Sequence, residues 1–394
     1  MTATSTPTPD GLLVHGMGKE PAEPDWPPLT QDEVGAVLAR YGEPGAGPGG
    51  EQAEITWWSP RPMSAAALVR GKSAGVFVKR HDLRVRTAQQ LAAEHAFAGY
   101  LRGQGLTVPA VRRTLDGATT VTSGQVVYEV HEVAAGVDLY REAVSWSPFA
   151  SLGHARAAGA ALARFHLASA GFGHPPRPPA ALISSCDVIT AADPLARVSE
   201  LLGQRPGLGG YLGARPWADD LARHVLPLIA RAAPLLRGLA RQWGHGDWHP
   251  SNLTWTSRAP DAGVAAVFDF GLANETFAVH DLAVAIERSA VAWLDLVDSG
   301  HAGIDLAAVN ALLDGYQMVR PLAAAEAAAL PGVLPVAHVE YALSEVEYFA
   351  SVLGSPELAD LAYDSYLLDH TRWFTTPEGE ILLAHLRHRA SRTT

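Results

Sequence analysis

Cysteine is almost absent from this chain of 394 residues, since Cys186 is the single one. One thiol cannot form a disulfide within the chain, and it cannot build a metal site from several cysteines. The composition therefore excludes a small disulfide-rich secreted scaffold. A reducing compartment fits this cysteine usage, and we expect a cytoplasmic protein.

Long apolar runs are also missing. No stretch of about 18 uncharged apolar residues occurs in the sequence. The N-terminal sequence MTATSTPTPD has no basic start followed by an apolar core. We therefore expect neither a secretion signal nor a membrane-spanning helix, and no membrane partner.

Positive charge is outnumbered. The sequence has 30 Lys and Arg against 41 Asp and Glu, a formal net charge of −11. A chain with this balance repels the phosphate backbone of nucleic acids, so we expect no nucleic-acid partner. The sequence gives no indication of the oligomeric state.

Lysine and asparagine are also rare, with three residues of each type. Their positions are Lys19, Lys72, Lys79, Asn252, Asn274 and Asn310. Because each type occurs so rarely, a lysine or an asparagine that falls at the required place in a motif is strong support for that motif.

The composition that remains, with 48% apolar and 18% charged residues, is typical of a globular chain with more than one compact unit.

The chain divides into three segments. Residues 1–28 hold six prolines among Ser, Thr and Gly, which predicts a disordered tail. Residues 29–133 begin with the capping-box spacing of Thr30 and Glu33 and continue with short β-prone runs and a helix. Residues 134–394 are mainly helical. The predicted fold class is α+β, with a small antiparallel β-sheet lobe that carries one helix and a large, mainly α-helical lobe.

The β-prone runs of the first lobe lie between turn residues. Three antiparallel strands are predicted at Ile55–Trp58, Ala66–Val69 and Gly75–Lys79. Two further strands are predicted at Val108–Thr114 and Thr119–Val133.

The chemistry is concentrated in the sequence W-G-H-G-D-W-H-P-S-N, where Asp247 precedes Asn252 by five residues, and in V-F-D-F-G, which contains Asp269. Phosphoryl transfer requires these groups. One Asp orients the attacking hydroxyl and receives its proton, while an Asn and a second Asp hold the Mg²⁺ that bridges the nucleotide phosphates. Upstream, Lys79 closes an apolar strand and Glu94 lies in the following helix, so the lysine can hold phosphates while the glutamate orients it.

The H-G-D-x-x-x-x-N sequence, the following D-x-x loop and the strand lysine together resemble the aminoglycoside phosphotransferase and choline-kinase branch of the protein-kinase-like fold, over about residues 50–350. The resemblance implies a two-lobed protein-kinase-like fold that transfers the γ-phosphoryl group of ATP to a small-molecule hydroxyl with Mg²⁺. The roles it implies are catalytic base for Asp247, orienting histidine for His245, metal ligands for Asn252 and Asp269, phosphate anchor for Lys79, its partner for Glu94, and backbone contacts to adenine for Glu132, Val133 and Ala134.

Two features depart from protein kinases. The turn Ser59–Ser64 contains no glycine, although protein kinases cover the phosphates with a glycine-rich loop. Asp281, at an expected helix start, comes only ten positions after Gly271, which leaves no room for a long activation segment. We therefore expect a small molecule, and not a protein, as the phosphoryl acceptor.

The acceptor itself is suggested by charge. Residues 340–380 contain nine acidic residues against Arg372 alone, with aromatic residues interleaved, and this favours a cationic amine or sugar such as an aminoglycoside. The alternative is a purely structural role, in which the acidic residues form a solvated helix face and the aromatic side chains lie in the core. Choline-like alcohols, homoserine and sugars stay open as acceptors. Residues 173–218, rich in Pro and Gly, lie where the resembled family inserts substrate-binding elements.

Two other functions compete with the kinase interpretation. The chain could be a catalytically silent, kinase-like nucleotide-binding protein. Alternatively, His245 and His249 could hold the metal ion of a hydrolase. The hydrolase interpretation leaves Asn252, Lys79 and Asp269 without a role.

Overall fold

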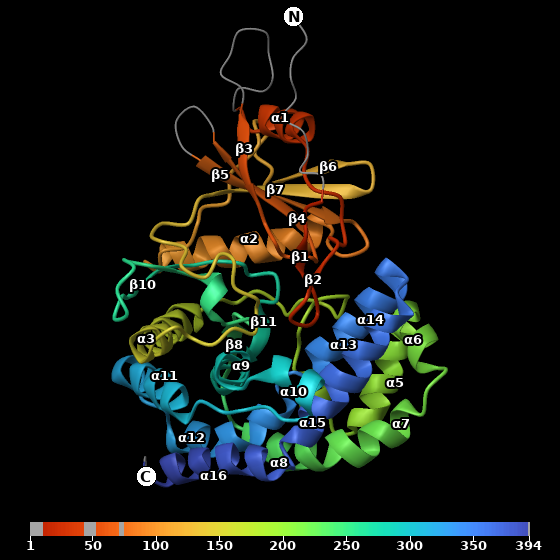
Figure 1. Ribbon diagram of the computed structural model, residues 1–394, viewed down its shortest axis with the longest axis vertical. Coiled ribbons are helices and arrows are strands. Elements are labelled where there is room, and N and C mark those ends of the chain that lie inside the picture. The colour runs from red at the N-terminus through yellow and green to blue at the C-terminus, as the bar shows by residue number, and fades with distance from the viewer. Residues whose placement is uncertain (1–10, 43–52, 71–74, 393–394) are drawn as a thin grey trace, which may run out of the picture. The chain divides into compact units, whose positions relative to one another are not determined.

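The computed structural model describes residues 11–42, 53–70 and 75–392, which form two compact units (Figure 1). The N-terminal unit comprises the residues up to 135 together with 266–268. The C-terminal unit comprises residues 136–265 and the residues from 269 onward. No helix in the described part of the chain is both long enough and apolar enough to cross a bilayer.

The N-terminal unit is built on an antiparallel five-stranded sheet of order β3-β4-β5-β7-β6. Its strands are β3 (Glu54–Trp58), β4 (Ala65–Arg70), β5 (Gly75–Asp82), β6 (Thr120–Ser123) and β7 (Val126–Glu132). In the β5–β7 register Lys79 lies opposite Glu129, so both side chains leave the same face of the sheet. Val78 and Val130 point to the other face.

Two helices accompany this sheet, α1 (Gln31–Arg40) and α2 (Ala88–Gly103). The expected capping box begins α1: Thr30 Oγ1 accepts from the backbone N–H of Glu33, and the Glu33 carboxylate accepts from that of Thr30. The apolar face of α1 shares a buried core with the valine face of the sheet, while α2 has its own capping box at Thr87.

The structure differs from the sequence predictions at three places in this unit. Of the expected disordered tail, residues 1–10 lie outside the described residues. Residues 11–28 contain the paired strands β1 (Val14–His15) and β2 (Pro21–Ala22), and Val14 is buried. Residues 108–114 contribute only an isolated bridge, Val111 to His131. Residues 119–133 form a hairpin and not one strand, because Gly124, with φ +58°, reverses the chain between β6 and β7.

The C-terminal unit is mainly helical, as expected. Its α-helices are α3 (Leu152–Ser169), α4 (Asp187–Thr190), α5 (Pro194–Gln204), α6 (Pro206–Leu212), α7 (Trp217–Asp220), α8 (Leu226–Leu236), α9 (Ala278–Ala290), α10 (Trp293–Ser299), α11 (Leu306–Val319), α12 (Ala324–Val333), α13 (Val339–Glu347), α14 (Pro356–Asp360), α15 (His370–Trp373) and α16 (Pro377–Ser391). Its π-helical segments are η1 (Leu221–Val225), η4 (Tyr348–Leu353) and η5 (Leu361–Asp369), and its 3₁₀ turns are η2 (Pro250–Asn252) and η3 (Leu334–Val336).

Two short ribbons frame the loop that carries the H-G-D sequence. Strand β8 (Arg241–Gly244) pairs with β11 (Asn274–Phe277), and β9 (Leu253–Trp255) pairs with β10 (Val264–Val267). The loop between β8 and β9 therefore has both ends fixed in hydrogen-bonded strands.

Helices α3 and α11 pack at very short range. A Cβ added to Gly159 on α3 would lie 1.9 Å from the carbonyl oxygen of Leu312, and one added to Gly315 on α11 would lie 1.9 Å from that of Arg156. The two glycines thus allow backbone-to-backbone contact. This contact fixes α3, whose last turn carries His166, under the H-G-D loop.

Candidate active site

A buried carboxylate holds the H-G-D loop from below. Asp281, in the first turn of α9, accepts from the backbone N–H groups of His245 (2.7 Å) and Gly246 (2.8 Å) and lies 3.0 Å from His166 Nε2. Burial alone would raise the pKa of Asp281, but the hydrogen bond from His166 lowers it below the usual value. Asp281 is therefore a fixed negative charge that positions the loop backbone.

The glycine of H-G-D is required by geometry. Gly246 has φ +76°, and a Cβ at this position would lie 2.5 Å from the carbonyl oxygen of Leu272. Any other residue would push the loop away from the D-F-G segment.

Asp247, the predicted catalytic base, sits among three polar groups. Its Oδ2 accepts from Asn252 Nδ2 (3.0 Å) and lies 3.3 Å from His249 Nε2, while its Oδ1 lies 3.4 Å from the Arg288 guanidinium. Burial alone would raise the pKa of Asp247, but His249 and Arg288 hold it well below the usual range. Asp247 is thus ionised at neutral pH and can accept a hydrogen bond from a hydroxyl.

His245 lies behind Asp247. Its side chain is fully buried, and its Nδ1 accepts from the backbone N–H of Asp247 at 3.3 Å. Its ring contacts those of Phe270 and Trp248, with centroids 5.3 and 5.4 Å away. These contacts fit the orienting role expected from the sequence. Among the described residues, His245 and His249 do not belong to a group of three His, Cys, Asp or Glu side chains whose ligand atoms lie close enough together to share an ion.

Asn252 and Asp269, the expected metal ligands, offer oxygen atoms. The amide nitrogen of Asn252 is committed to Asp247, donating to its backbone oxygen (2.9 Å) and its carboxylate, so Oδ1 is the atom suited to a metal ion. Asp269 has a positive φ of +61°. Among the described non-glycine residues, Leu182 is the only other one with a positive φ. Backbone strain of this kind is typical of functional sites. Amide and carboxylate oxygens fit Mg²⁺.

The nucleotide-binding residues expected from the sequence lie in the N-terminal unit. Lys79 is on β5, opposite Glu129. Glu94 on α2 is buried, and its carboxylate lies 3.3 Å from Arg86. The predicted pairing of Glu94 with Lys79 stays a prediction.

The proposed adenine contacts lie just beyond this sheet. Glu132 ends β7, and its backbone N–H donates to Ala110. Val133 is exposed and Ala134 is half-buried. Their role stays a prediction as well.

Sequence reasoning missed a group of side chains next to Asp247, which we call the Arg288 cluster: Trp146, Glu287, Arg288, Tyr341 and Glu345. The Arg288 guanidinium lies over the rings of Trp146 (4.1 Å) and Tyr341 (5.2 Å). The missed signal was the Glu-Arg pair in the apolar helix α9, every residue of which is buried. Charges inside such a helix indicate a polar site.

The two glutamates of the Arg288 cluster hold their protons unusually well. Burial raises the pKa of Glu345 to about 7 against the lowering effect of Arg288, and it raises the pKa of Glu287 to about 7 as well. Oε2 of Glu345 has no hydrogen-bond partner among the described residues. A buried carboxylate oxygen of this kind can accept a hydrogen bond from a donor group of a ligand.

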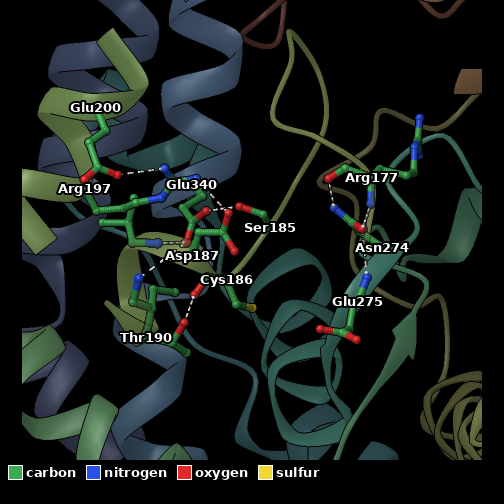
Figure 2. A network of polar contacts seen from close by, with 12 residues as sticks. Arg177, Ser185, Cys186, Asp187, Thr190, Arg197, Glu200, Asn274, Glu275 and Glu340 are labelled. Carbon is green, nitrogen blue, oxygen red and sulfur yellow. Dashed lines mark hydrogen bonds and ion pairs between the residues drawn. The ribbon is translucent and has the colours of Figure 1, made fainter. Parts of the chain in front are cut away.

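Of the acidic residues in 340–380, only Glu340 and Glu345 are buried. Glu340 is occupied by the chain itself, because its carboxylate accepts from Ser185 Oγ (Figure 2). It also accepts from the backbone N–H of Val188 (2.8 Å) at the start of α4. The acidic residues of this segment are therefore mainly a solvated helix face, which is the alternative that the sequence left open to a cation-binding surface. Glu345 is the member that lies near Asp247.

Asn274, another of the three asparagines, has a structural role. Its Oδ1 accepts from the backbone N–H of Arg177 (2.7 Å), and its Nδ2 donates to the backbone oxygen of Ser184 (2.8 Å), as Figure 2 shows for the first contact. The Arg177 side chain in turn donates to the backbone oxygens of Gly271 and Ala273. Residues 173–218 are thus attached to the strand that follows the D-F-G segment.

The chain is similar to several known proteins. The family model described as "Phosphotransferase enzyme family" matches residues 64–327, more than half of the chain. The homoserine kinase of Methylobacillus flagellatus is 27% identical over 222 residues, which cover 55% of this chain and 59% of that protein. The chain thus spans less than two thirds of the length of this relative.

Solved structures match more of the chain at lower identity. A microcompartment-associated aminopropanol kinase has a TM-score of 0.54 and 16% identity, covering 88% of this chain and 98% of that one. The amicoumacin kinase hAmiN, solved with AMP-PNP, Ca²⁺ and Ami, has a TM-score of 0.51 and 14% identity, covering 87% and 89%. These likenesses show the fold, and they confirm the expected protein-kinase-like class.

Proposed function

The chain belongs to the phosphotransferase enzyme family, and on this premise we propose that it transfers the γ-phosphoryl group of ATP to a hydroxyl of a small molecule. The observation that supports this most is the environment of Asp247, which is ionised and hydrogen-bonded to Asn252. An ionised carboxylate at this place in H-G-D-x-x-x-x-N can orient an acceptor hydroxyl and receive its proton.

In the proposed reaction, the acceptor hydroxyl donates a hydrogen bond to Asp247. The hydroxyl oxygen forms a bond to the γ-phosphorus, the bond from that phosphorus to the β–γ bridging oxygen breaks, and ADP leaves. The hydroxyl proton passes to Asp247 and then to solvent. Positioning and neutralisation of charge supply most of the rate in this chemistry.

The remaining roles are those expected from the sequence. Mg²⁺, held by Asn252 and Asp269, would neutralise charge on the phosphates. Lys79 would bind the phosphates with Glu94 as its partner, and the backbone of residues 132–134 would contact the adenine. His245 positions the backbone of Asp247 through their hydrogen bond.

For the acceptor, we propose a small hydroxyl compound that carries an amino group. Glu345 offers an unpartnered carboxylate oxygen, and Arg288 offers a guanidinium fixed over two aromatic rings, both in the cluster beside Asp247. A hydroxy amino acid matches both charges, with its ammonium at Glu345 and its carboxylate at Arg288. The name of the relative, homoserine kinase, is consistent with this class. Amino alcohols and aminoglycosides share only the amine.

The test is Mg²⁺-dependent release of ADP from ATP across a panel of hydroxy amino acids, amino alcohols, aminoglycosides and sugars. Asp247→Asn is the blank, because it keeps the size of the side chain and removes its charge. Asp219→Asn, at an exposed position of α7, is the matched control. We expect a hit among hydroxy amino acids that vanishes in Asp247→Asn and persists in the control. A hit with equal turnover in Asp247→Asn would contradict the proposed role of Asp247.

A further inference from the structure

Three histidines surround one carboxylate in the N-terminal unit, outside the proposed catalytic machinery. Oε2 of Glu129 lies 2.6 Å from His95 Nε2 and 2.9 Å from His131 Nε2, and Oε1 lies 2.9 Å from His81 Nε2. Glu129 and His131 come from β7, His81 from β5 and His95 from α2. Three separate elements therefore place nitrogen ligands around the same side chain.

The register explains why these side chains meet. Glu129 and His131 are two residues apart on β7, so they leave the same face of the sheet, and His81 on β5 faces that side as well. His95 approaches from α2. The side chains of Glu129 and His95 are 5% and 6% exposed, whereas that of His131 is 23% exposed. The group is therefore buried but reachable from one side.

We propose that His95, Glu129 and His131 form a binding site for a divalent transition-metal ion of the zinc type. The ligand atoms of these three residues all lie within 4.8 Å of one another. Two imidazoles and one carboxylate are a ligand set that suits Zn²⁺ in tetrahedral geometry, with the fourth position open to water. The metal ion would join α2 to β7.

The surroundings of the site are those of a metal centre. His95 Nδ1 lies 2.8 Å from Thr119 Oγ1, so the ring can direct the lone pair of Nε2 at an ion while its other nitrogen donates to the hydroxyl. His81 can donate to Oε1 of Glu129 and leave Oε2 for the ion. Contacts of this kind orient the ligands of metal sites.

This site is chemically distinct from the proposed magnesium site. Asn252 and Asp269 offer only oxygen atoms, which suit Mg²⁺, whereas imidazole nitrogens favour Zn²⁺ and Co²⁺. The two sites can therefore be filled separately. The inference does not depend on the proposed phosphotransferase activity.

The experiment uses the full chain, stripped with a chelator and then saturated with Mg²⁺ so that oxygen sites are filled. Zn²⁺ is titrated by calorimetry into the wild type, into His131→Gln and into His301→Gln. His131 is chosen because it is the most exposed ligand, and His301, 79% exposed, is the control. We expect one equivalent of Zn²⁺ to bind to the wild type and to the control, with at least about tenfold weaker binding to His131→Gln.

A second readout needs no variant. Co²⁺ added to the Mg²⁺-saturated wild type should give the intense visible absorption of a tetrahedral site, and Zn²⁺ should abolish it. The proposal is overturned if the wild type gives no such band. It is equally overturned if a folded His131→Gln variant binds Zn²⁺ as tightly as the wild type.

Discussion

At the scale of single residues, Arg288 connects the base to the proposed acceptor site. Its guanidinium lies 3.4 Å from Asp247 and stacks over Trp146. The same side chain therefore does two things: it lowers the pKa of Asp247 and offers a planar, two-pronged donor to a ligand.

Replacing Arg288 by Lys separates these two effects. The charge beside Asp247 is retained, but the planar donor and its stacking are lost. We expect the KM for a carboxylate-bearing acceptor to rise about tenfold while kcat changes less than about threefold. Steady-state kinetics with the hit from the acceptor panel measure both, with Arg372→Lys on the exposed face of α15 as the control. A fall in kcat at unchanged KM would show instead that Arg288 acts in the transfer step.

Glu345 predicts a pH dependence of stability. Its pKa is raised to about 7 in the folded chain from the ordinary 4.5, so the folded state keeps a proton that the unfolded state releases between these pH values. The free energy of unfolding therefore falls as the pH rises from 4.5 to 7, by at most about 3 kcal/mol for this group.

The variant Glu345→Gln removes this contribution. The stability of this variant relative to the wild type should be higher at pH 8 than at pH 5, as measured by urea denaturation at both values. Glu378→Gln, at a side chain that is 44% exposed, should follow the wild type at both. The same difference between Glu345→Gln and wild type at pH 5 and pH 8 would count against the raised pKa.

At the scale of helices and strands, the pair α3 and α11 determines where His166 lies. His166 is hydrogen-bonded on one side to Asp281 and on the other to Tyr316 of α11, at 2.7 Å. His166 and Asp281 thus connect the α3–α11 helix pair to the backbone of the H-G-D loop through hydrogen bonds.

The close approach at Gly159 makes this helix contact sensitive to a single methyl group. The variant Gly159→Ala would place its Cβ against the Leu312 carbonyl oxygen, and we expect a loss of about 1–3 kcal/mol in stability. Gly203→Ala on α5, where a Cβ meets nothing within 4 Å, is the matched control and should be neutral or stabilising. Thermal unfolding of the two variants measures the difference. Equal melting temperatures would mean that α3 and α11 separate without cost.

At the scale of the whole molecule, the sequence predicts best what lies close together along the chain. Asp247 and Asn252 occupy one loop, so their spacing alone marked them as one group, and the structure joins them by a hydrogen bond. Arg288 could not be found in this way, because its place depends on how deeply α9 is buried.

The same limit applies to the fold. The three histidines around Glu129 come from separate elements, and they meet through the register of β5 with β7 and the packing of α2 against the sheet. The hairpin β6–β7 was predicted as one strand because the turn at Gly124 interrupts an otherwise continuous β-prone run. Local patterns predict elements, whereas contacts between elements require the tertiary structure.

The most direct test of the central claim is the product of the reaction. The full chain is incubated with ATP, Mg²⁺ and the best acceptor from the panel, and phosphorylated acceptor and ADP are quantified together by mass spectrometry and chromatography. We predict one phosphorylated acceptor for each ADP, with a rate that falls about 100-fold or more in Asp247→Asn. ADP formed without phosphorylated acceptor, or an undiminished rate in Asp247→Asn, would contradict transfer to a small-molecule hydroxyl with Asp247 as its base.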